Sequence, residues 1–412
     1  MIEKQLHVLV IPSWYPRVEN PLSGIFFREQ SLALKRAGYQ VGLIYPQLSS
    51  ISKLGKSVKW LSGGISGVDD DGVMSYRLYG WRRGMRFIYG PDTYLCCAID
   101  KLFNYYVKRH GMPNIIHAHS ALMGGYQAAF LKQKYGIPFV VTEHSSAIAK
   151  ANITLLEKQV VRDVCSNADE VIVVSPQLGE LLNRSYDNAA QDYKWVPNMV
   201  EEHRFVKNVS LERTPRADGK IVFLNVSMLI QGKGHIELLK AFSAAFSRRK
   251  DVTLRIGGNG NMREELEKLS KFLGISAQVK FLGLQSRNQV FQEMRDADVF
   301  VFPSHFETFG VVLIEALASG IPIIATKSNG PECICMPENG LLVSVGNVEE
   351  LSEGMQYMAL NYQNYNKQCL IEKCWEQFGE RAFVSNLTHI YQNILRDESF
   401  NSDMKKLDSV SN

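Results

Sequence analysis

The sequence predicts an α/β protein made of two doubly wound domains, each with a parallel sheet covered by helices. The chain has 412 residues, which exceeds the size at which one hydrophobic core keeps growing. Short β-rich runs alternate with helical segments along its length, a pattern typical of parallel sheets with crossover helices. The alternation breaks at residues 199–219 and restarts near Lys220. We therefore expect one doubly wound sheet in each half.

The predicted strands follow from apolar runs bounded by turn residues. In the first half they are residues 6–12, 39–46, 114–120, 137–145, 169–175 and 194–198, with a helix at 24–38 after the first strand. In the second half they are residues 221–227, 252–258, 278–283, 298–304, 321–326 and 339–345. Residues 398–412 are polar, and we expect a flexible tail there.

Composition favours a cytoplasmic protein. Hydrophobic residues make up 45% and charged residues 21% of the chain, as in ordinary globular proteins. The seven cysteines have no regular spacing and no histidine cluster accompanies them, so we expect free thiols and no metal site. The apolar run before Pro12 is too short for a signal peptide, and no stretch is long enough to cross a bilayer.

The excess of basic residues lies in the first 200 residues. Two stretches there, 80–90 (GWRRGMRFIYG) and 101–110 (KLFNYYVKRH), mix cations with aromatic side chains. Such segments suit an anionic membrane surface, which predicts an inner-membrane peripheral location; a solvated basic face is the alternative. The basic residues line no recognition helix, so nucleic acid is not an expected partner.

Residues 305–320 (HFETFGVVLIEALASG) follow a predicted strand and open a helix. In doubly wound sheets ligands bind at such strand ends. Glu307 then lies in the loop and Glu315 near the second turn of the helix. The first-turn N–H groups suit a phosphate, whereas a carboxylate suits hydroxyl groups such as those of sugars. The alternative is an ordinary helix-end charge and a solvated loop residue.

Two further strand ends carry glycine-rich turns. Lys233 stands between glycines after the strand at 221–227 and is suited to a diphosphate as a point charge. The segment is no Walker loop, because GxxxxGK[ST] is absent. Gly258 and Gly260 follow the strand at 252–258, and an Asn-Gly-Pro turn follows the strand at 321–326.

Together these motifs resemble the retaining glycosyltransferases of family 4 (glycosyl transferases group 1), which have the GT-B fold. The signature is a glutamate, seven residues and a second glutamate, inside PSxxExFGxxxxEAxAxGxP, here residues 303–322. VPNMV at 196–200 is similar to the segment that joins the family's domains. The first half matches more loosely, through Gly24, HAHS and PFVVTEHS. Its opening, IPSWYP followed by NPLSGIFFREQ, resembles polysaccharide-assembly members.

The resemblance implies two Rossmann-like domains facing across a cleft. Residues 1–199 would bind the acceptor and residues 200–397 the sugar nucleotide, with the last helix packing back on the first domain. The implied reaction moves a sugar from a nucleoside-diphosphate sugar to a glycan or lipid-linked saccharide with retention, in capsular, exo- or O-antigen polysaccharide assembly. The family uses no metal and no other cofactor for this, and no carboxylate nucleophile is implied.

The resemblance also implies roles for individual residues. Glu315 would bind the ribose and Glu307 the donor sugar, while Lys233 and the backbone near Phe309 would hold the diphosphate. The remaining donor-binding residues would be Gly24, Met228, Gly258, Gly260, Leu282, Thr308, Gly310 and Val311. The catalytic residues would be His119, Lys233 and Glu307.

One position departs from the family. Members often carry an arginine five residues before the lysine, as a second cation for the diphosphate, and here that residue is Met228. Either Lys233 acts with the helix dipole alone, or another cation such as Arg287 contributes.

The acceptor side is expected around two strand ends of the first half. We assign His117 and His119 to opposite faces of their strand, with His119 orienting the acceptor hydroxyl or relaying its proton. Glu143 and His144, at the end of the next strand, are the other acceptor-binding candidates. The alternative for each is a buried, structural side chain.

Two other functions remain open at this point. The chain is also compatible with another GT-B enzyme, such as an epimerase or phosphorylase, or with a non-catalytic sugar-nucleotide-binding subunit. The sequence does not identify the donor sugar, its base, the acceptor, the linkage or the oligomeric state.

Overall fold

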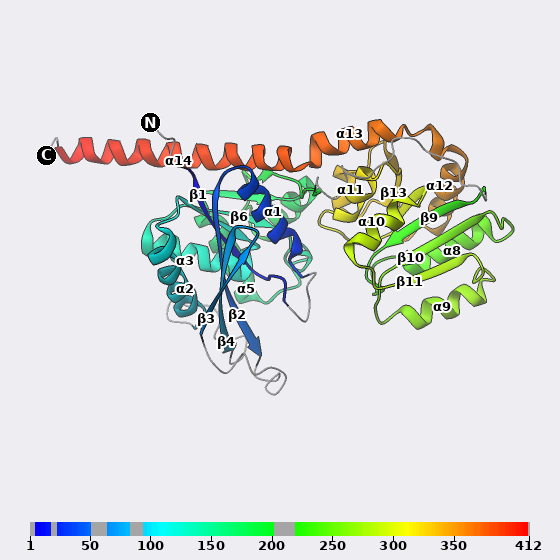
Figure 1. Cartoon of the computed structure of the whole chain (residues 1–412), viewed down its shortest axis with the longest axis horizontal. Coiled ribbons are helices and arrows are strands. Elements are labelled where there is room, and N and C mark those ends of the chain that lie inside the picture. The colour runs from blue at the N-terminus through cyan, green and yellow to red at the C-terminus, as the bar shows by residue number, and fades with distance from the viewer. Residues whose placement is uncertain (1–4, 18–22, 51–63, 83–93, 202–218, 411–412) are drawn as a thin grey trace. The chain divides into compact units, whose positions relative to one another are not determined.

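A computed structural model describes residues 5–17, 23–50, 64–82, 94–201 and 219–410. The chain divides into two compact units. The first consists of Met1–Val174, Gly179–Val196 and Val384–Asn412, and the second of Ser175–Leu178 and Pro197–Phe383. Each unit contains one sheet flanked by helices (Figure 1). The predicted fold class, two doubly wound α/β domains, is confirmed.

The sheet of the first unit has eight strands in the order β3-β4-β2-β1-β5-β6-β7-β8. All neighbours pair in parallel except β3 with β4. The strands are β1 (His7–Pro12), β2 (Gln40–Ser50), β3 (Ile65–Asp70), β4 (Val73–Arg82), β5 (Ile115–His119), β6 (Phe139–Glu143), β7 (Glu170–Val173) and β8 (Lys194–Trp195). The last is only two residues long, shorter than the strand predicted at 194–198.

Sequence patterning missed the hairpin of β3 and β4. Its turn is Asp71–Gly72, with φ of 51° and 87°, and an Asp-Gly pair at positive φ is a strong hairpin signal. β3 carries mostly polar or small residues and is largely exposed, so it lacks the apolar run that marks the other strands.

The helices of the first unit follow the strands in alternation. They are α1 (Ile25–Arg36), α2 (Tyr94–His110), the π-helical turn η4 (Ala121–Gly125), α3 (Tyr126–Tyr135), α4 (Ser146–Ala149), α5 (Leu155–Asn167) and most of α6 (Pro176–Ser185), whose first residues up to Leu178 belong to the second unit. Their starts have local causes: α5 begins in a capping box, in which Thr154 and Glu157 satisfy each other's backbone N–H groups.

The second unit has six parallel strands in the order β11-β10-β9-β12-β13-β14. They are β9 (Ile221–Val226), β10 (Val252–Gly257), β11 (Val279–Gly283), β12 (Val299–Phe302), β13 (Ile323–Thr326) and β14 (Gly340–Val343). The helices are α8 (His235–Phe246), α9 (Arg263–Phe272), α10 (Arg287–Arg295), α11 (Val311–Ala318), α12 (Val348–Asn361) and α13 (Lys367–Phe378), with 3₁₀ turns η5 (Gly330–Cys333) and η6 (Tyr362–Asn364).

One hydrophobic core fixes the sheet of the second unit against α8 and α12. Phe223, Leu254 and Val301 from the strands meet Phe242 of α8 and Met355 of α12, all fully buried. Each such side chain contributes about 1.5–3 kcal/mol through burial. Because the strands are parallel, this packing brings their carboxyl ends to one edge of the sheet.

The helix α14 (Glu380–Val410) belongs mostly to the first unit. The Tyr391 hydroxyl lies 2.5 Å from His117 Nδ1, and the Tyr39 hydroxyl lies 2.5 Å from Thr388 Oγ1. The sequence predicted a flexible tail from residue 398. The backbone continues as helix to Val410, because residues 380–410 contain no proline or glycine to end the helix. The flexibility of this end stays a prediction.

Candidate functional site

Two loops of the second unit meet through the glycines on either side of Lys233. Gly232 and Gly234 both have positive φ, 86° and 71°. A Cβ atom on Gly234 would lie 1.9 Å from the Pro303 carbonyl oxygen, and the Gly232 carbonyl accepts a hydrogen bond from the His305 N–H at 2.9 Å. Only glycine allows so close an approach. The loop after β9 therefore packs closely on the loop after β12 and is hydrogen-bonded to it.

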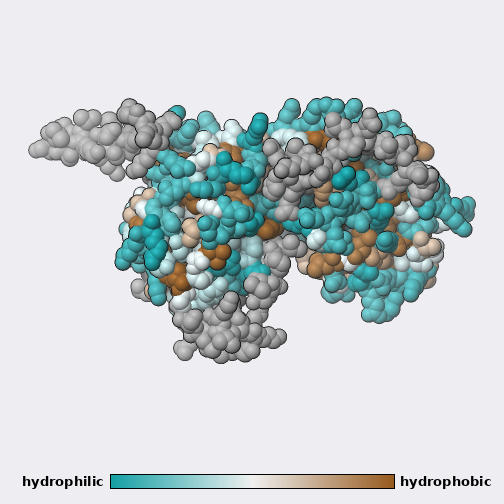
Figure 2. Space-filling view, in the orientation of Figure 1, coloured by the Kyte–Doolittle hydropathy of each residue, from teal (hydrophilic) through white to brown (hydrophobic). Residues whose placement is uncertain are grey.

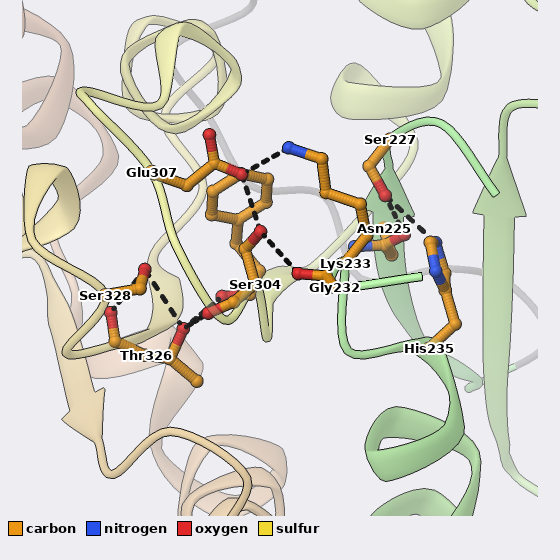
Figure 3. A network of polar contacts seen from close by, with 10 residues as sticks. Asn225, Ser227, Gly232, Lys233, His235, Ser304, Glu307, Thr326 and Ser328 are labelled. Carbon is orange, nitrogen blue, oxygen red and sulfur yellow. Dashed lines mark hydrogen bonds and ion pairs between the residues drawn. The ribbon is translucent and has the colours of Figure 1, made fainter. Parts of the chain in front are cut away.

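This approach brings Lys233 to Glu307, which is 74 residues away in sequence (Figure 3). Lys233 Nζ lies 2.5 Å from Glu307 Oε1, and the Ser304 hydroxyl donates to the same oxygen at 2.6 Å. In Figure 3 the other carboxylate oxygen of Glu307 points away from both donors. One oxygen is thus anchored to the protein, and the second is oriented to accept hydrogen bonds.

The backbone under Glu307 is fixed by the strand end of β13. The Glu307 N–H donates to the Ser328 carbonyl at 2.8 Å, and its carbonyl accepts from the Gly330 N–H at 3.0 Å. The Thr326 hydroxyl donates to the Ser304 carbonyl, and these hydroxyl residues are buried. Sequence reasoning named neither Thr326 nor Ser328, although both stand where β13 ends.

The helix α11 begins beside Glu307. Gly310 is its N-cap with φ of 103°, and Val311 is its first residue. Phe309 is 1% exposed and packs on Phe378, with ring centroids 5.9 Å apart. The first turn of a helix presents N–H groups without intrahelical partners at the positive end of the dipole. Thr308 connects this turn to Glu307, so a cation, a carboxylate and a helix start adjoin one another.

Glu315 lies one turn further along α11 and contacts a different cation. Its Oε1 is 3.8 Å from Arg287 Nη2, which is also 3.5 Å from Glu201 Oε2. The sequence makes Arg287 a candidate to replace the arginine missing at Met228. The structure places its guanidinium between two carboxylates instead, and Met228 itself is 62% exposed.

The glycines after β10 have a packing role of their own. A Cβ atom on Gly258, whose φ is 137°, would lie 1.9 Å from the Ser227 carbonyl oxygen, and one on Gly260 would lie 2.1 Å from the Leu229 carbonyl oxygen. Their small size thus serves the approach of the loops after β9 and β10. The Leu282 carbonyl, at the end of β11, accepts from the Gln285 amide at 2.8 Å.

His235 is a buried residue beside this network that sequence reasoning did not select as a ligand. Its Nε2 lies 2.9 Å from the Ser227 hydroxyl, which also donates to Asn225 Oδ1. Burial and the charge of Lys233 lower the pKa of His235 to about 4. The imidazole is therefore neutral at pH 7 and leaves Lys233 as the cation of this loop.

In the first unit, His117 and His119 lie on the same face of β5. Their rings stack with centroids 4.4 Å apart, so the predicted placement on opposite faces is wrong. The physical reason is the two-residue period of a strand, which points residues i and i+2 in the same direction. His119 also stacks on Phe27 at 4.5 Å and is 1% exposed.

The acceptor candidates Glu143 and His144 adjoin this stack. His144 Nε2 lies 3.2 Å from His119 Nδ1. The Glu143 carboxylate is buried and accepts four hydrogen bonds, from the Ser120 hydroxyl and the N–H groups of Ala121, His144 and Ser145, at 2.7–2.8 Å. Burial raises the pKa of Glu143, and these four donors oppose the rise. The contacts give Glu143 a structural role at the ends of β5 and β6.

Gly24 supports the same stack. It is the N-cap of α1 with φ of 71°. A Cβ atom there would lie 2.7 Å from the Trp14 carbonyl oxygen and 3.1 Å from the Phe27 ring. Its absence lets Phe27 reach His119.

Both halves of the chain match known families. Residues 24–204 match the family model described as Glycosyltransferase Family 4, and residues 207–370 match the one described as Glycosyl transferases group 1. This chain belongs to the family 4 glycosyltransferases. The predicted membership of glycosyltransferase family 4 is therefore confirmed.

Curated relatives align with this family 4 member over only part of their own length. The D-inositol 3-phosphate glycosyltransferase of Corynebacterium jeikeium is 29% identical over 275 residues, 60% of this chain and 64% of that protein. The lipopolysaccharide core biosynthesis glycosyltransferase LpsE of Rhizobium meliloti is 33% identical over 191 residues, 46% of this chain and 54% of that protein. The chain thus spans less than two thirds of either relative.

Solved structures support the GT-B fold. Sucrose-phosphate synthase from Thermosynechococcus elongatus has a TM-score of 0.72 at 21% identity, covering 96% of this chain and all of that one. Anabaena HepE in complex with UDP has a TM-score of 0.71 at 16% identity, covering 94% of this chain and all of that one. The predicted GT-B fold of the family 4 member is confirmed.

The segments predicted to meet a membrane are only partly described. Most of residues 80–90 lies outside the described residues. Residues 101–110 lie on α2, where Phe103 and Tyr106 are core residues and Arg109 stacks on Tyr105 at 3.4 Å. On the face in Figure 2 hydrophilic residues predominate, and hydrophobic ones form small areas. Among the described residues, no helix has the length and apolar character needed to cross a bilayer.

The histidine stack predicts acid sensitivity. Burial lowers the pKa of His117 and of His144 to about 3, and that of His119 well below its ordinary value. In the unfolded chain a histidine titrates near 6.5, so between about pH 6.5 and 3 the unfolded state binds more protons. The free energy of unfolding should therefore fall as the pH drops below 6.5, by about 1.4 kcal/mol per pH unit for each histidine.

Urea unfolding from pH 8 to pH 5 measures this slope. The raised pKa of Glu143 acts in the opposite direction, so the net slope should be smaller than the histidines alone give. His117→Gln should flatten the curve, whereas His389→Gln, at an exposed histidine of α14, should not. Equal free energies of unfolding at pH 8 and pH 5 would contradict the predicted acid sensitivity of the stack.

Proposed function

We propose that this family 4 member transfers a sugar from a nucleoside-diphosphate sugar to a saccharide or lipid-linked saccharide acceptor, with retention of configuration. The observation that carries the proposal is the contact of Lys233 with Glu307 at 2.5 Å beside the start of α11. A fixed cation and a helix start suit a diphosphate, and a carboxylate with one outward oxygen suits sugar hydroxyls.

The proposed roles of the site residues follow from the charge that develops during the reaction. When the bond between the sugar carbon and the diphosphate breaks, negative charge grows on the leaving oxygen. Lys233 and the first-turn N–H groups of α11 are arranged to stabilise that charge. The acceptor oxygen forms the new bond on the same face of the sugar, and its proton passes to the departing diphosphate. Glu307 holds the sugar, and Glu315 binds the ribose.

Other proteins support the substrate class. HepE has been solved with UDP, with UDP and glucose, and with UDP-glucose. The names of the relatives include glycosyltransferases of inositol phosphate and of lipopolysaccharide core. We propose that the donor of this chain is a sugar nucleotide. The proposed acceptor is a glycan or lipid-linked saccharide of surface polysaccharide assembly. His119 and His144 are the residues we propose nearest the acceptor, at a cytoplasmic or inner-membrane surface.

A thermal-shift screen across UDP-, GDP- and ADP-sugars tests donor binding. At a concentration of 100 times the dissociation constant, a donor should stabilise the protein by about 2.7 kcal/mol. The matching donor, incubated with candidate acceptors, should then release nucleoside diphosphate, and NMR of the product should show the retained anomer. The proposal fails if no sugar nucleotide shifts the melting temperature. Binding without release under any acceptor would favour the non-catalytic subunit.

Glu315→Ala should weaken nucleoside-diphosphate binding. The variant removes a charged hydrogen-bond acceptor from the ribose, a loss of roughly 1.5–3 kcal/mol, or about tenfold or more in affinity. Isothermal titration with UDP and GDP measures it. Glu264→Ala, at an exposed glutamate of the same unit, serves as the control and should bind like the parent. Unchanged affinity in Glu315→Ala would contradict the ribose role.

A further inference from the structure

Arg287 occupies a position that local helix physics disfavours. It is the first residue of α10, whose start is fixed by a capping box between Ser286 and Gln289. The Ser286 N–H donates to Gln289 Oε1 at 2.9 Å, and the Gln289 N–H donates to the Ser286 hydroxyl at 3.4 Å. A helix start carries positive partial charge, so a cation there is unfavourable. Some other interaction must offset this.

The offset comes from two carboxylates that are far apart in sequence. Arg287 Nη2 lies 3.5 Å from Glu201 Oε2 and 3.8 Å from Glu315 Oε1. The Glu201 side chain is 3% exposed, while those of Arg287 and Glu315 are 23% and 20% exposed. A carboxylate buried this deeply needs a cationic partner. Glu201 therefore holds the guanidinium, and the guanidinium faces Glu315.

We propose that Arg287 is a positioning residue for the nucleotide ribose, acting through the Glu315 carboxylate. The inference rests on the proposed function, in which Glu315 binds that ribose. The guanidinium attracts the Glu315 carboxylate and orients it, while Glu201 holds the guanidinium in place. The carboxylate then accepts hydrogen bonds from the ribose hydroxyls. A planar guanidinium suits this task, since it can face two carboxylates at once.

The contacts favour this role over that of a second diphosphate cation. The charge of Arg287 is already shared by two carboxylates, whereas the cation beside Glu307 and the start of α11 is Lys233. Arg287 thus acts on the nucleoside part of the donor. Replacing Arg287 should change the preference for ribose over deoxyribose nucleotides more than it changes the rate at which the bound sugar reacts.

The test compares ribose with deoxyribose. Isothermal titration measures the affinities of UDP, 2′-deoxy-UDP and 3′-deoxy-UDP, with the GDP and ADP series alongside, for the parent, Glu315→Ala, Arg287→Met and Arg255→Met. Arg255 is the matched control: it pairs at 2.9 Å with Glu293 on the same helix α10, and the two side chains are 25% and 22% exposed.

In the parent, at least one deoxy form should bind about tenfold or more weakly than the ribose form. Arg287→Met should bring this ratio below about threefold by losing affinity for the ribose form alone, and Glu315→Ala should do the same. Arg255→Met should keep the parent's ratio. A merely structural role for Arg287 would weaken the ribose and deoxy forms equally.

The outcomes separate this inference from the proposed function. If Glu315→Ala abolishes the preference for the ribose form and Arg287→Met retains it, the proposed role of Arg287 is contradicted and the ribose role of Glu315 stands. A parent that binds nucleotide without any ribose preference overturns both roles. A parent that binds no nucleotide overturns the proposed function itself. If Arg287→Met does not fold, Arg287→Gln, which keeps polar contacts without the charge, is measured instead with the same expectations.

Discussion

Lys233→Met is expected to lower the rate of sugar transfer on the order of a hundredfold to a thousandfold, the usual effect of removing one group that stabilises developing negative charge. The physical reason is that the lysine meets charge that grows on the leaving diphosphate, so its loss is felt mainly in the transition state. Release of nucleoside diphosphate at saturating donor and acceptor measures the rate.

The folding equilibrium should change far less. The pair of Lys233 with Glu307 is partly exposed, 25% and 14%, and such pairs contribute about 1 kcal/mol or less. Lys132→Met is the matched control, because Lys132 forms a 2.6 Å ion pair with Asp169 in the first unit. It should show a similar change in melting temperature and full transfer activity. Equal transfer rates in Lys233→Met and the parent would show that another cation stabilises the leaving group.

Glu307→Gln should separate donor binding from diphosphate binding. Transfer should fall on the order of tenfold to a thousandfold, because the amide loses the charge that strengthens each hydrogen bond to the sugar. The affinity for free nucleoside diphosphate should rise. The reason for this rise is that Glu307 holds Lys233 at 2.5 Å and competes with the diphosphate for it.

The expected rise is about two- to fivefold, the equivalent of one partly exposed ion pair. Both quantities are measured on one preparation, with Glu293→Gln as the control, since Glu293 pairs with Arg255 at a similar exposure. A fall in diphosphate affinity with sugar selectivity retained would assign Glu307 to the nucleotide and contradict our division of labour.

Sequence patterning found the elements because their signals are local. The apolar runs that became β9 to β14 are bounded by turn residues, and their order already predicts a doubly wound sheet. The strand ends then identified Lys233 and Glu307 as candidates, one after β9 and one after β12. Two errors were also local: the Asp71–Gly72 turn carried a hairpin signal that we did not use, and the two-residue period of β5 already places His117 and His119 together.

The contacts that position the site depend on segments far apart in the chain. Lys233 meets Glu307 because Gly234 lets one loop pack on Pro303. The small size of Gly258 and Gly260 likewise allows the loop after β10 to pack on the loop after β9.

The amino-acid sequence by itself determined the two doubly wound sheets, the family, and which side chains stand at the strand ends. Periodicity and turn chemistry act over a few residues, and those properties depend on nothing further. Only the tertiary structure decided that Arg287 stands between Glu201 and Glu315, and that Lys233 is held by Glu307. The partners are separated by tens of residues, and which loops touch is set by the packing of whole sheets and helices.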